Sequence, residues 1–162
     1  MLPQLNLPPF DVKISQQGDD AFIHDLIRNK PVVLTPEEWV RQHFLNFLIS
    51  EKKYPKGLIS VEKSSGNKDV MNRTDIVVYN EFGNPWMIIE CKADDVAITN
   101  DTFYQALRYH MNLNAQYIVV TNGMEHYCVS LRENDFVFMD DLPEYEKQRI
   151  DWSIILSFYY CT

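Results

Sequence analysis

Residues 73–92, RTDIVVYNEFGNPWMIIECK, decide the fold of this chain. Two apolar runs in this stretch are predicted to be strands; Asp75 stands at the head of the first and Glu90-Cys91-Lys92 at the tail of the second. Because side chains alternate between the two faces of a strand, Glu90 and Lys92 are expected on one face and Cys91 on the other. We therefore expect two carboxylates and one ammonium group at one end of a sheet, an arrangement that suits a divalent metal and a phosphodiester.

The acid-x-Lys trio is a weak signal by itself, since it occurs at Asp11–Lys13, at Glu51–Lys53 and at Glu90–Lys92. The first follows two prolines and has no acidic partner strand. The second ends an amphipathic helix, where charges normally face water. Only the third ends a buried-looking strand, where ionised groups need a partner or a metal. A surface salt bridge at a strand end is the alternative interpretation of that trio.

The composition is that of a single folded domain. The chain has 162 residues, 46% of them hydrophobic and 13% aromatic, which excludes disorder. Its most apolar stretch, Trp152–Cys161, is too short to span a bilayer, and the start of the chain carries no positive side chain of a signal peptide. Three cysteines without CxxC spacing indicate neither a disulfide framework nor a zinc site. We expect a cytoplasmic protein with no membrane partner.

The charge is unevenly distributed along the chain. A net charge of −8 counts against indiscriminate binding of nucleic acid. Residues 51–73 nevertheless carry six cations against three carboxylates, whereas residues 132–151 carry seven acids against three bases. Lys63, Lys68 and Arg73 in the basic stretch are candidate DNA-binding residues. Ordinary solvated loops are the alternative interpretation of both stretches.

The pattern of elements predicts an α/β (α+β mixed) fold with a central mixed β-sheet flanked by helices. Thr35 followed by Pro36 is a strong helix start, and this helix is expected to run to about Glu51. A second helix is expected from Thr99 or Asn100 to Leu113, and a third over Glu144–Cys161. Strands are expected at Leu58–Glu62, Thr74–Tyr79, Pro85–Cys91, Gln116–Thr121, Tyr127–Leu131 and Phe136–Met139, a turn at Ser64–Lys68, and weaker strand or turn segments at Asp11–Ser15 and Ala21–Ile27.

Asp75, then Glu90-Cys91-Lys92, then Gln105-Ala-Leu-Arg-Tyr109, in that order, resemble the core of the PD-(D/E)xK nucleases. The variant resembles the N-terminal endonuclease domain of type I restriction enzyme R subunits, as do the stretches LTPEEWVRQHFLNFLI and QALRYHMNLNAQYIVVTNG. The resemblance covers about residues 32–130. It implies a restriction-endonuclease-like core within a single domain of residues 1–162, with an N-terminal extension over residues 1–31 and a C-terminal extension over residues 131–162.

The resemblance implies a DNA endonuclease that depends on Mg²⁺, with Mn²⁺ as a substitute. Asp75 and Glu90 would hold the metal, with the backbone carbonyl of Cys91 as a further ligand. Lys92 would orient the attacking water or help to deprotonate it.

Three further residues are candidates for the same site. By the resemblance, Gln105 and Tyr109 would line it as catalytic residues, and they project from one face of the second helix. Glu38 is an additional candidate, although a capping box at the start of the first helix accounts for it.

The chain departs from R subunits in one respect, because it has no GxxxxGK[ST] loop for an ATP-driven translocase. Restriction together with partner subunits is therefore left open, and a homodimer is expected because two strands are most easily cut by two chains. A catalytically silent nuclease-fold module that binds nucleic acid or a protein is the alternative function. A metal-dependent enzyme acting on a small phosphate ester is a third.

Overall fold

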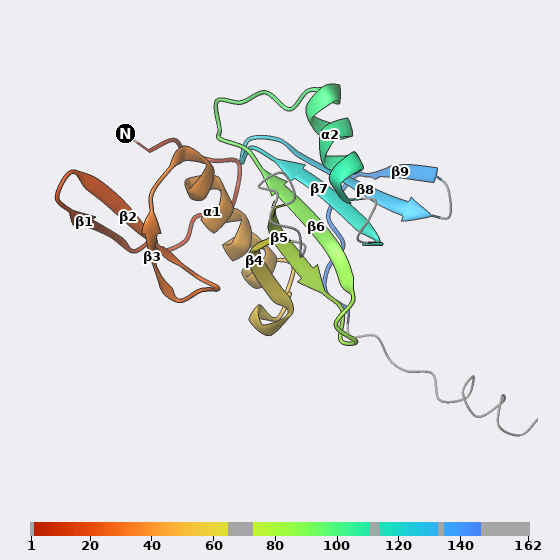
Figure 1. Cartoon of the computed structure of the whole chain (residues 1–162), viewed down its shortest axis with the longest axis horizontal. Helices are drawn as coiled ribbons and strands as arrows, with labels where there is room; N and C mark the ends of the chain where they lie inside the picture. Colours follow the sequence, from red (N-terminus) through yellow and green to blue (C-terminus); the bar gives the residue numbers. More distant parts are fainter. Residues whose placement is uncertain (1, 65–72, 111–113, 133–134, 147–162) are drawn as a thin grey trace, which may run out of the picture.

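The computed structural model describes residues 2–64, 73–110, 114–132 and 135–146 (Figure 1). Among them it has a mixed sheet of six strands in the order β4-β5-β6-β7-β8-β9, and a separate antiparallel sheet in the order β1-β2-β3. The predicted mixed sheet with flanking helices is confirmed. The six strands are β4 (Ile59–Ser64), β5 (Arg73–Tyr79), β6 (Pro85–Cys91), β7 (Tyr117–Thr121), β8 (His126–Arg132) and β9 (Asp135–Met139).

One parallel pair sets the topology of the six-stranded sheet. All neighbouring strands are antiparallel except β6 and β7, whose register pairs Ile88 with Ile118 and Glu90 with Val120. A parallel pair needs a long crossover, and here it contains helix α2 (Asn100–His110). The crossover leaves β6 directly after Cys91, so the chain turns away at the point where the acid-x-Lys trio lies.

The two helices cover opposite faces of the six-stranded sheet (Figure 1). Helix α1 (Pro36–Ser50) begins after Thr35, whose Oγ1 accepts a hydrogen bond of 3.0 Å from the backbone N of Glu38. Its apolar face packs on one side of the sheet, where Val119 is buried, while α2 packs on the other side against Ile118 and Val120. Period-2 alternation along β7 thus supplies side chains to two separate cores.

The small N-terminal sheet was only partly predicted. Its strands are β1 (Ile14–Gln17), β2 (Asp20–Asp25) and β3 (Lys30–Val33), and the third of these was missed. Strand β1 is exposed along its whole length, so it lacks the apolar alternation that identifies a strand, and Pro31 disfavours a strand at β3. This sheet is attached to α1 by a hydrogen bond of 3.0 Å from the backbone N of Leu26 to Oε1 of Gln42.

Other predicted boundaries differ from the structure by a few residues. A short 3-10 helix, η1 (Lys56–Leu58), precedes β4, so that strand begins one residue later than expected. The predicted C-terminal helix lies outside the described residues from residue 147 onward, and residues 144–146 are not helical. The predicted turn lies outside them from residue 65 onward. Within the described parts of the chain, no helix is long and apolar enough to cross a membrane.

Two glycines with left-handed backbones give a test of the packing around the N-terminal segment. Gly123 has φ +81°, and a Cβ there would lie 2.9 Å from Cδ2 of Leu5 and 3.2 Å from Cγ2 of Val40, both buried. Gly18 has φ +64° and nothing within 4 Å. We predict that Gly18→Ala lowers the free energy of unfolding by about 1 kcal/mol through backbone strain alone. Gly123→Ala should lose a further ~1–3 kcal/mol through overpacking, measured by urea unfolding. Equal losses in the two variants would show that the contact of Gly123 with Leu5 and Val40 is not tight.

Candidate active site

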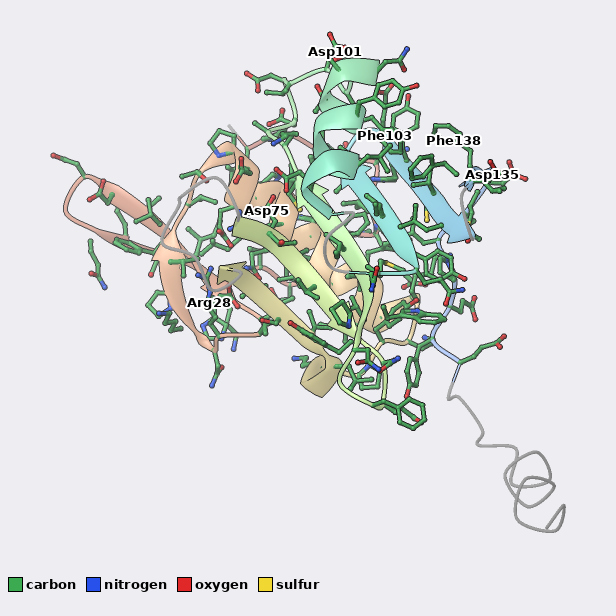
Figure 2. All side chains as sticks on the ribbon, turned by 45° about the vertical axis from the view of Figure 1, so that its right-hand side comes forward. Arg28, Asp75, Asp101, Phe103, Asp135 and Phe138 are labelled. Carbon is green, nitrogen blue, oxygen red and sulfur yellow. The ribbon has the colours of Figure 1, made fainter. Side chains whose placement is uncertain are left out.

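The carboxylates of Asp75 and Glu90 lie together at one end of the six-stranded sheet. Strands β5 and β6 pair Ile76 with Ile89, and Asp75 directly precedes this pair while Glu90 directly follows it. The backbone N of Cys91 donates a hydrogen bond of 2.8 Å to Oδ2 of Asp75. Figure 2 shows Asp75 at the start of β5. Two strand ends thus bring together acids that are 15 positions apart in sequence.

Lys92 lies beside these carboxylates. Its Nζ is 2.8 Å from Oε1 of Glu90, and its backbone N donates to the carbonyl oxygen of Thr121 on β7. Burial pushes the pKa of Lys92 down, but the hydrogen bond to Glu90 and the charges of Glu90 and Asp75 outweigh burial and raise it. The side chain is therefore an ammonium ion that donates to Glu90.

Arg41, which was not singled out from the sequence, contacts three carboxylates from the middle of α1. Its Nη2 lies 2.8 Å from Oδ1 of Asp75 and 2.9 Å from Oε1 of Glu37, and its Nη1 binds Oε2 of Glu38. Burial opposes the charged form, yet Asp75 and Glu38 raise the pKa of Arg41 above its ordinary value. The guanidinium, whose side chain is only 5% exposed, is thus a permanent buried cation between α1 and β5.

Glu37, and not Glu38, is the first-helix acid that faces the Asp75–Lys92 group. Burial and the charge of Asp75 raise the pKa of Glu37, and its side chain is 44% exposed. Glu38 instead lies inside, where Oε1 accepts a hydrogen bond of 2.8 Å from Nε2 of Gln42 and Oε2 is bound by Arg41. The spacing of residues 37 and 41 by four, one turn of helix, was the available sequence signal for this contact.

The other predicted site residues are only partly described. Gln105 and Tyr109 lie one turn apart on α2, but their side chains are outside the described part of the structure. Lys63 lies on β4, where it pairs with Thr74, and Arg73 begins β5; only their backbones are described. Lys68 lies outside the described residues altogether.

The Cys91 side chain is fully buried in the core beneath α1, on the face that alternation predicts. Burial raises the pKa of this thiol well above its ordinary value, so it stays protonated. A ligand role therefore falls to the backbone carbonyl of Cys91 alone, and it stays a prediction.

We use the term sheet-end charge cluster for six side chains joined by these contacts and charges: Glu37, Glu38, Arg41, Asp75, Glu90 and Lys92. With all six ionised, the cluster has four carboxylates against two cations, a formal charge of −2. Burial, and after it the charges of the neighbouring carboxylates of Asp75 and Glu37, raise the pKa of Glu90.

Oxygen ligands and a surplus of two negative charges fit Mg²⁺, which binds through one or two carboxylates and keeps several waters. In the described residues, however, no group of three or more His, Cys, Asp or Glu side chains converges as a ready-made metal site. Both oxygens of Asp75 already accept hydrogen bonds, from Arg41 and from the backbone N of Cys91. The donor set therefore fits the ion in chemistry, and Asp75 must share its oxygens between the protein and the metal.

A mixed sheet between two helices, with Asp75 and the Glu90–Lys92 trio at its end, defines an α+β domain with a charged site at one end of its sheet. Residues 36–143 match the family model described as type I restriction enzyme R protein N terminus (HSDR_N), and the chain belongs to this family. The matched segment begins with α1 and continues past β9, so it includes the whole charge cluster. No curated protein matches the chain.

The raised pKa of Glu90 predicts a pH dependence of stability. Because folding favours the neutral carboxyl, its contribution is full below the unfolded pKa of about 4.3 and is lost as the pH rises through the higher folded pKa. Glu90→Gln has no such proton to lose. Without divalent cations, its unfolding free energy relative to the native chain should rise between about pH 3 and about pH 7 in urea titrations.

Asp141 supplies the matched control with the opposite sign. A hydrogen bond from Nζ of Lys52 lowers the pKa of Asp141, so its contribution is present above the unfolded pKa and is lost as the pH falls. Asp141→Asn should therefore become less stable relative to the native chain as the pH rises. Slopes of the same sign for the two variants would contradict a raised pKa of Glu90 from burial and neighbouring carboxylates.

Proposed function

We propose that this chain is a metal-dependent DNA endonuclease that hydrolyses phosphodiester bonds. One observation carries the proposal: Asp75 and Glu90 are neighbours at the end of the sheet where β5 begins and β6 finishes, and Nζ of Lys92 lies 2.8 Å from Oε1 of Glu90. The chain's membership of a restriction enzyme family supports the same chemistry and a restriction-system context. The family context, and the reducing environment that suits the unpaired Cys91 and Cys128, support a cytoplasmic location.

Asp75 and Glu90 are the proposed ligands of Mg²⁺ or Mn²⁺, with the Cys91 carbonyl as a third. When bound, the ion would lower the pKa of its water and stabilise negative charge on the phosphate oxygens. The Glu90 carboxylate positions the Lys92 ammonium. Because the charged form of Lys92 is favoured, we assign it to orienting the attacking water and to stabilising charge at phosphorus. Gln105 and Tyr109 are proposed to position DNA or Lys92, in line with the resemblance of their motif.

The proposed DNA approach is from the β4–β5 side of the molecule. Lys63 lies on the edge strand β4, Arg73 begins the neighbouring strand β5, and Lys68 lies between them in sequence. The opposite edge strand, β9, begins with the exposed Asp135, which would repel phosphates. In Figure 2, Asp135 lies at the right of the molecule, well apart from Asp75 near the middle. A homodimer would then place two such sites on the two DNA strands.

A second candidate function is a nuclease-fold module that binds nucleic acid or a restriction-system subunit without cutting. The observation that favours it is the engagement of both Asp75 oxygens by protein donors. Such a module would bind DNA with Asp75, Glu90 and Lys92 intact and would leave it uncut in the presence of Mg²⁺ or Mn²⁺.

Plasmid nicking with Mg²⁺ or Mn²⁺ tests the proposed function. The native chain should convert supercoiled DNA to the nicked form, and Lys92→Ala should lower the rate by about 100-fold or more, since a positioned catalytic group contributes that much. Lys13→Ala is the matched control, because Lys13 ends another acid-x-Lys trio, is exposed and is not part of the sheet-end charge cluster. It should cut at the native rate.

Circular dichroism of each variant separates loss of catalysis from loss of fold. Native-like cutting by a folded Lys92→Ala protein would remove Lys92 from the mechanism. Binding of DNA by the native chain, with no nicking in either metal, would favour the second candidate function.

A further inference from the structure

We propose that Arg41 is a positioning residue of the active site: it holds Asp75 in place when the metal is absent, and it tunes how tightly a divalent cation binds. This inference rests on the proposed function, because it takes Asp75 and Glu90 as the metal ligands. Arg41 would act through these carboxylates and would not itself touch DNA, since its side chain is only 5% exposed.

The geometry makes Arg41 the internal counter-ion of the sheet-end charge cluster. A single nitrogen, Nη2, lies 2.8 Å from Asp75 Oδ1 and 2.9 Å from Glu37 Oε1, while Nη1 binds Glu38. The Asp75 and Glu38 side chains are 13% and 7% exposed, so water can replace little of this interaction. Buried carboxylates without a cation are strongly destabilising. Arg41 therefore stabilises the folded state most when no metal is present.

Further contacts of Glu38 fix the position of the Arg41 guanidinium. Glu38, which binds Nη1, also accepts a hydrogen bond from Gln42 and lies 3.8 Å from Nη2 of Arg28. Arg28 in turn binds Asp25, which is fully buried at the end of β2, through an Nε–Oδ2 contact of 2.7 Å. Alternating charges thus run from the N-terminal sheet to Asp75. This chain of contacts holds Arg41 in one place, so its charge acts on the metal ligands from a fixed distance.

A fixed positive charge next to Asp75 opposes a second cation on the same carboxylate. The formal charge of the cluster with and without Arg41 shows the expected effect on metal binding. With Arg41 present, the formal charge is −2, and a divalent cation neutralises it. With Arg41 replaced by a neutral residue, the formal charge becomes −3, and Lys92 is the one cation of the cluster that remains to repel the metal. Such a variant should bind divalent cations more tightly and should depend on them more strongly for its stability.

Mn²⁺ binding and thermal unfolding of the purified chain test this inference without any activity assay. We expect Arg41→Gln to have a lower Tm than the native chain in EDTA. Addition of Mn²⁺ should raise the Tm of the variant by more than it raises the Tm of the native chain. By isothermal titration calorimetry, its dissociation constant for Mn²⁺ should fall about tenfold or more. A residue that only stabilised the fold would lower Tm without changing the response to Mn²⁺.

Lys52→Gln is the matched control. Lys52 is also a buried cation, with a side chain 8% exposed and bound to Asp141, but it lies just beyond the far end of α1. Its loss should lower Tm and leave the Mn²⁺ affinity at the native value. An equal gain in affinity for Lys52→Gln and Arg41→Gln would show a general effect of net charge and would overturn the proposal, as would unchanged or weaker binding by Arg41→Gln.

Two further variants keep the outcome decisive. If Arg41→Gln does not fold, Arg41→Lys retains the charge and loses the forked geometry. It should be less stable than the native chain, with an Mn²⁺ affinity within about twofold of native; a tenfold change would contradict a role through charge. Asp75→Asn separates this inference from the proposed function. Native-like Mn²⁺ binding by Asp75→Asn refutes the metal assignment itself, whereas lost binding there with no effect of Arg41→Gln refutes the role of Arg41 alone.

Discussion

The buried ion pair between Arg41 and Asp75 is the interaction on which the site depends. It joins α1 to the first residues of β5. Asp75 also accepts a hydrogen bond from the backbone N of Cys91, which links β5 to β6. The pair therefore fixes the helix and two strands at the one place where Glu90 and Lys92 also lie. Because a buried carboxylate needs a cation, the fold and the charge arrangement at the sheet end stabilise each other.

The layers of the fold explain why chemistry is concentrated at this end of the sheet. Apolar side chains on alternating positions of β7 supply one core beneath α1 and another beneath α2, and β6 adds Met87, Ile89 and Cys91 to the core beneath α1. Beyond Cys91 the chain leaves the sheet to form the crossover, so the side chains at this end of β6 need not be apolar and can be ionised. The chain belongs to the family of type I restriction enzyme R protein N termini, and the matched segment includes this charged strand end.

The strand-based part of the site was predictable from the sequence, whereas the helix-based part was not. Asp75, Glu90 and Lys92 follow from two apolar runs and the period of a strand, which are local properties. Arg41 reaches Asp75 across 34 positions, and that contact depends on how α1 lies on the sheet. Glu38 was an additional candidate that a capping box accounted for, and its carboxylate binds Gln42 and Arg41 inside the protein, whereas Glu37 was not considered. The strands of the N-terminal sheet are short and mostly exposed, so they show little periodicity.

The most direct test of this account is the anomalous diffraction of Mn²⁺ in crystals of the native chain. A single strong peak should lie between the carboxylates of residues 75 and 90, with Arg41 still in contact with the remaining oxygen of Asp75. Manganese bound only at exposed acids such as Asp135 or Asp140, with none at the end of β5 and β6, would contradict the account. So would carboxylates of Asp75 and Glu90 that point away from each other in the crystal.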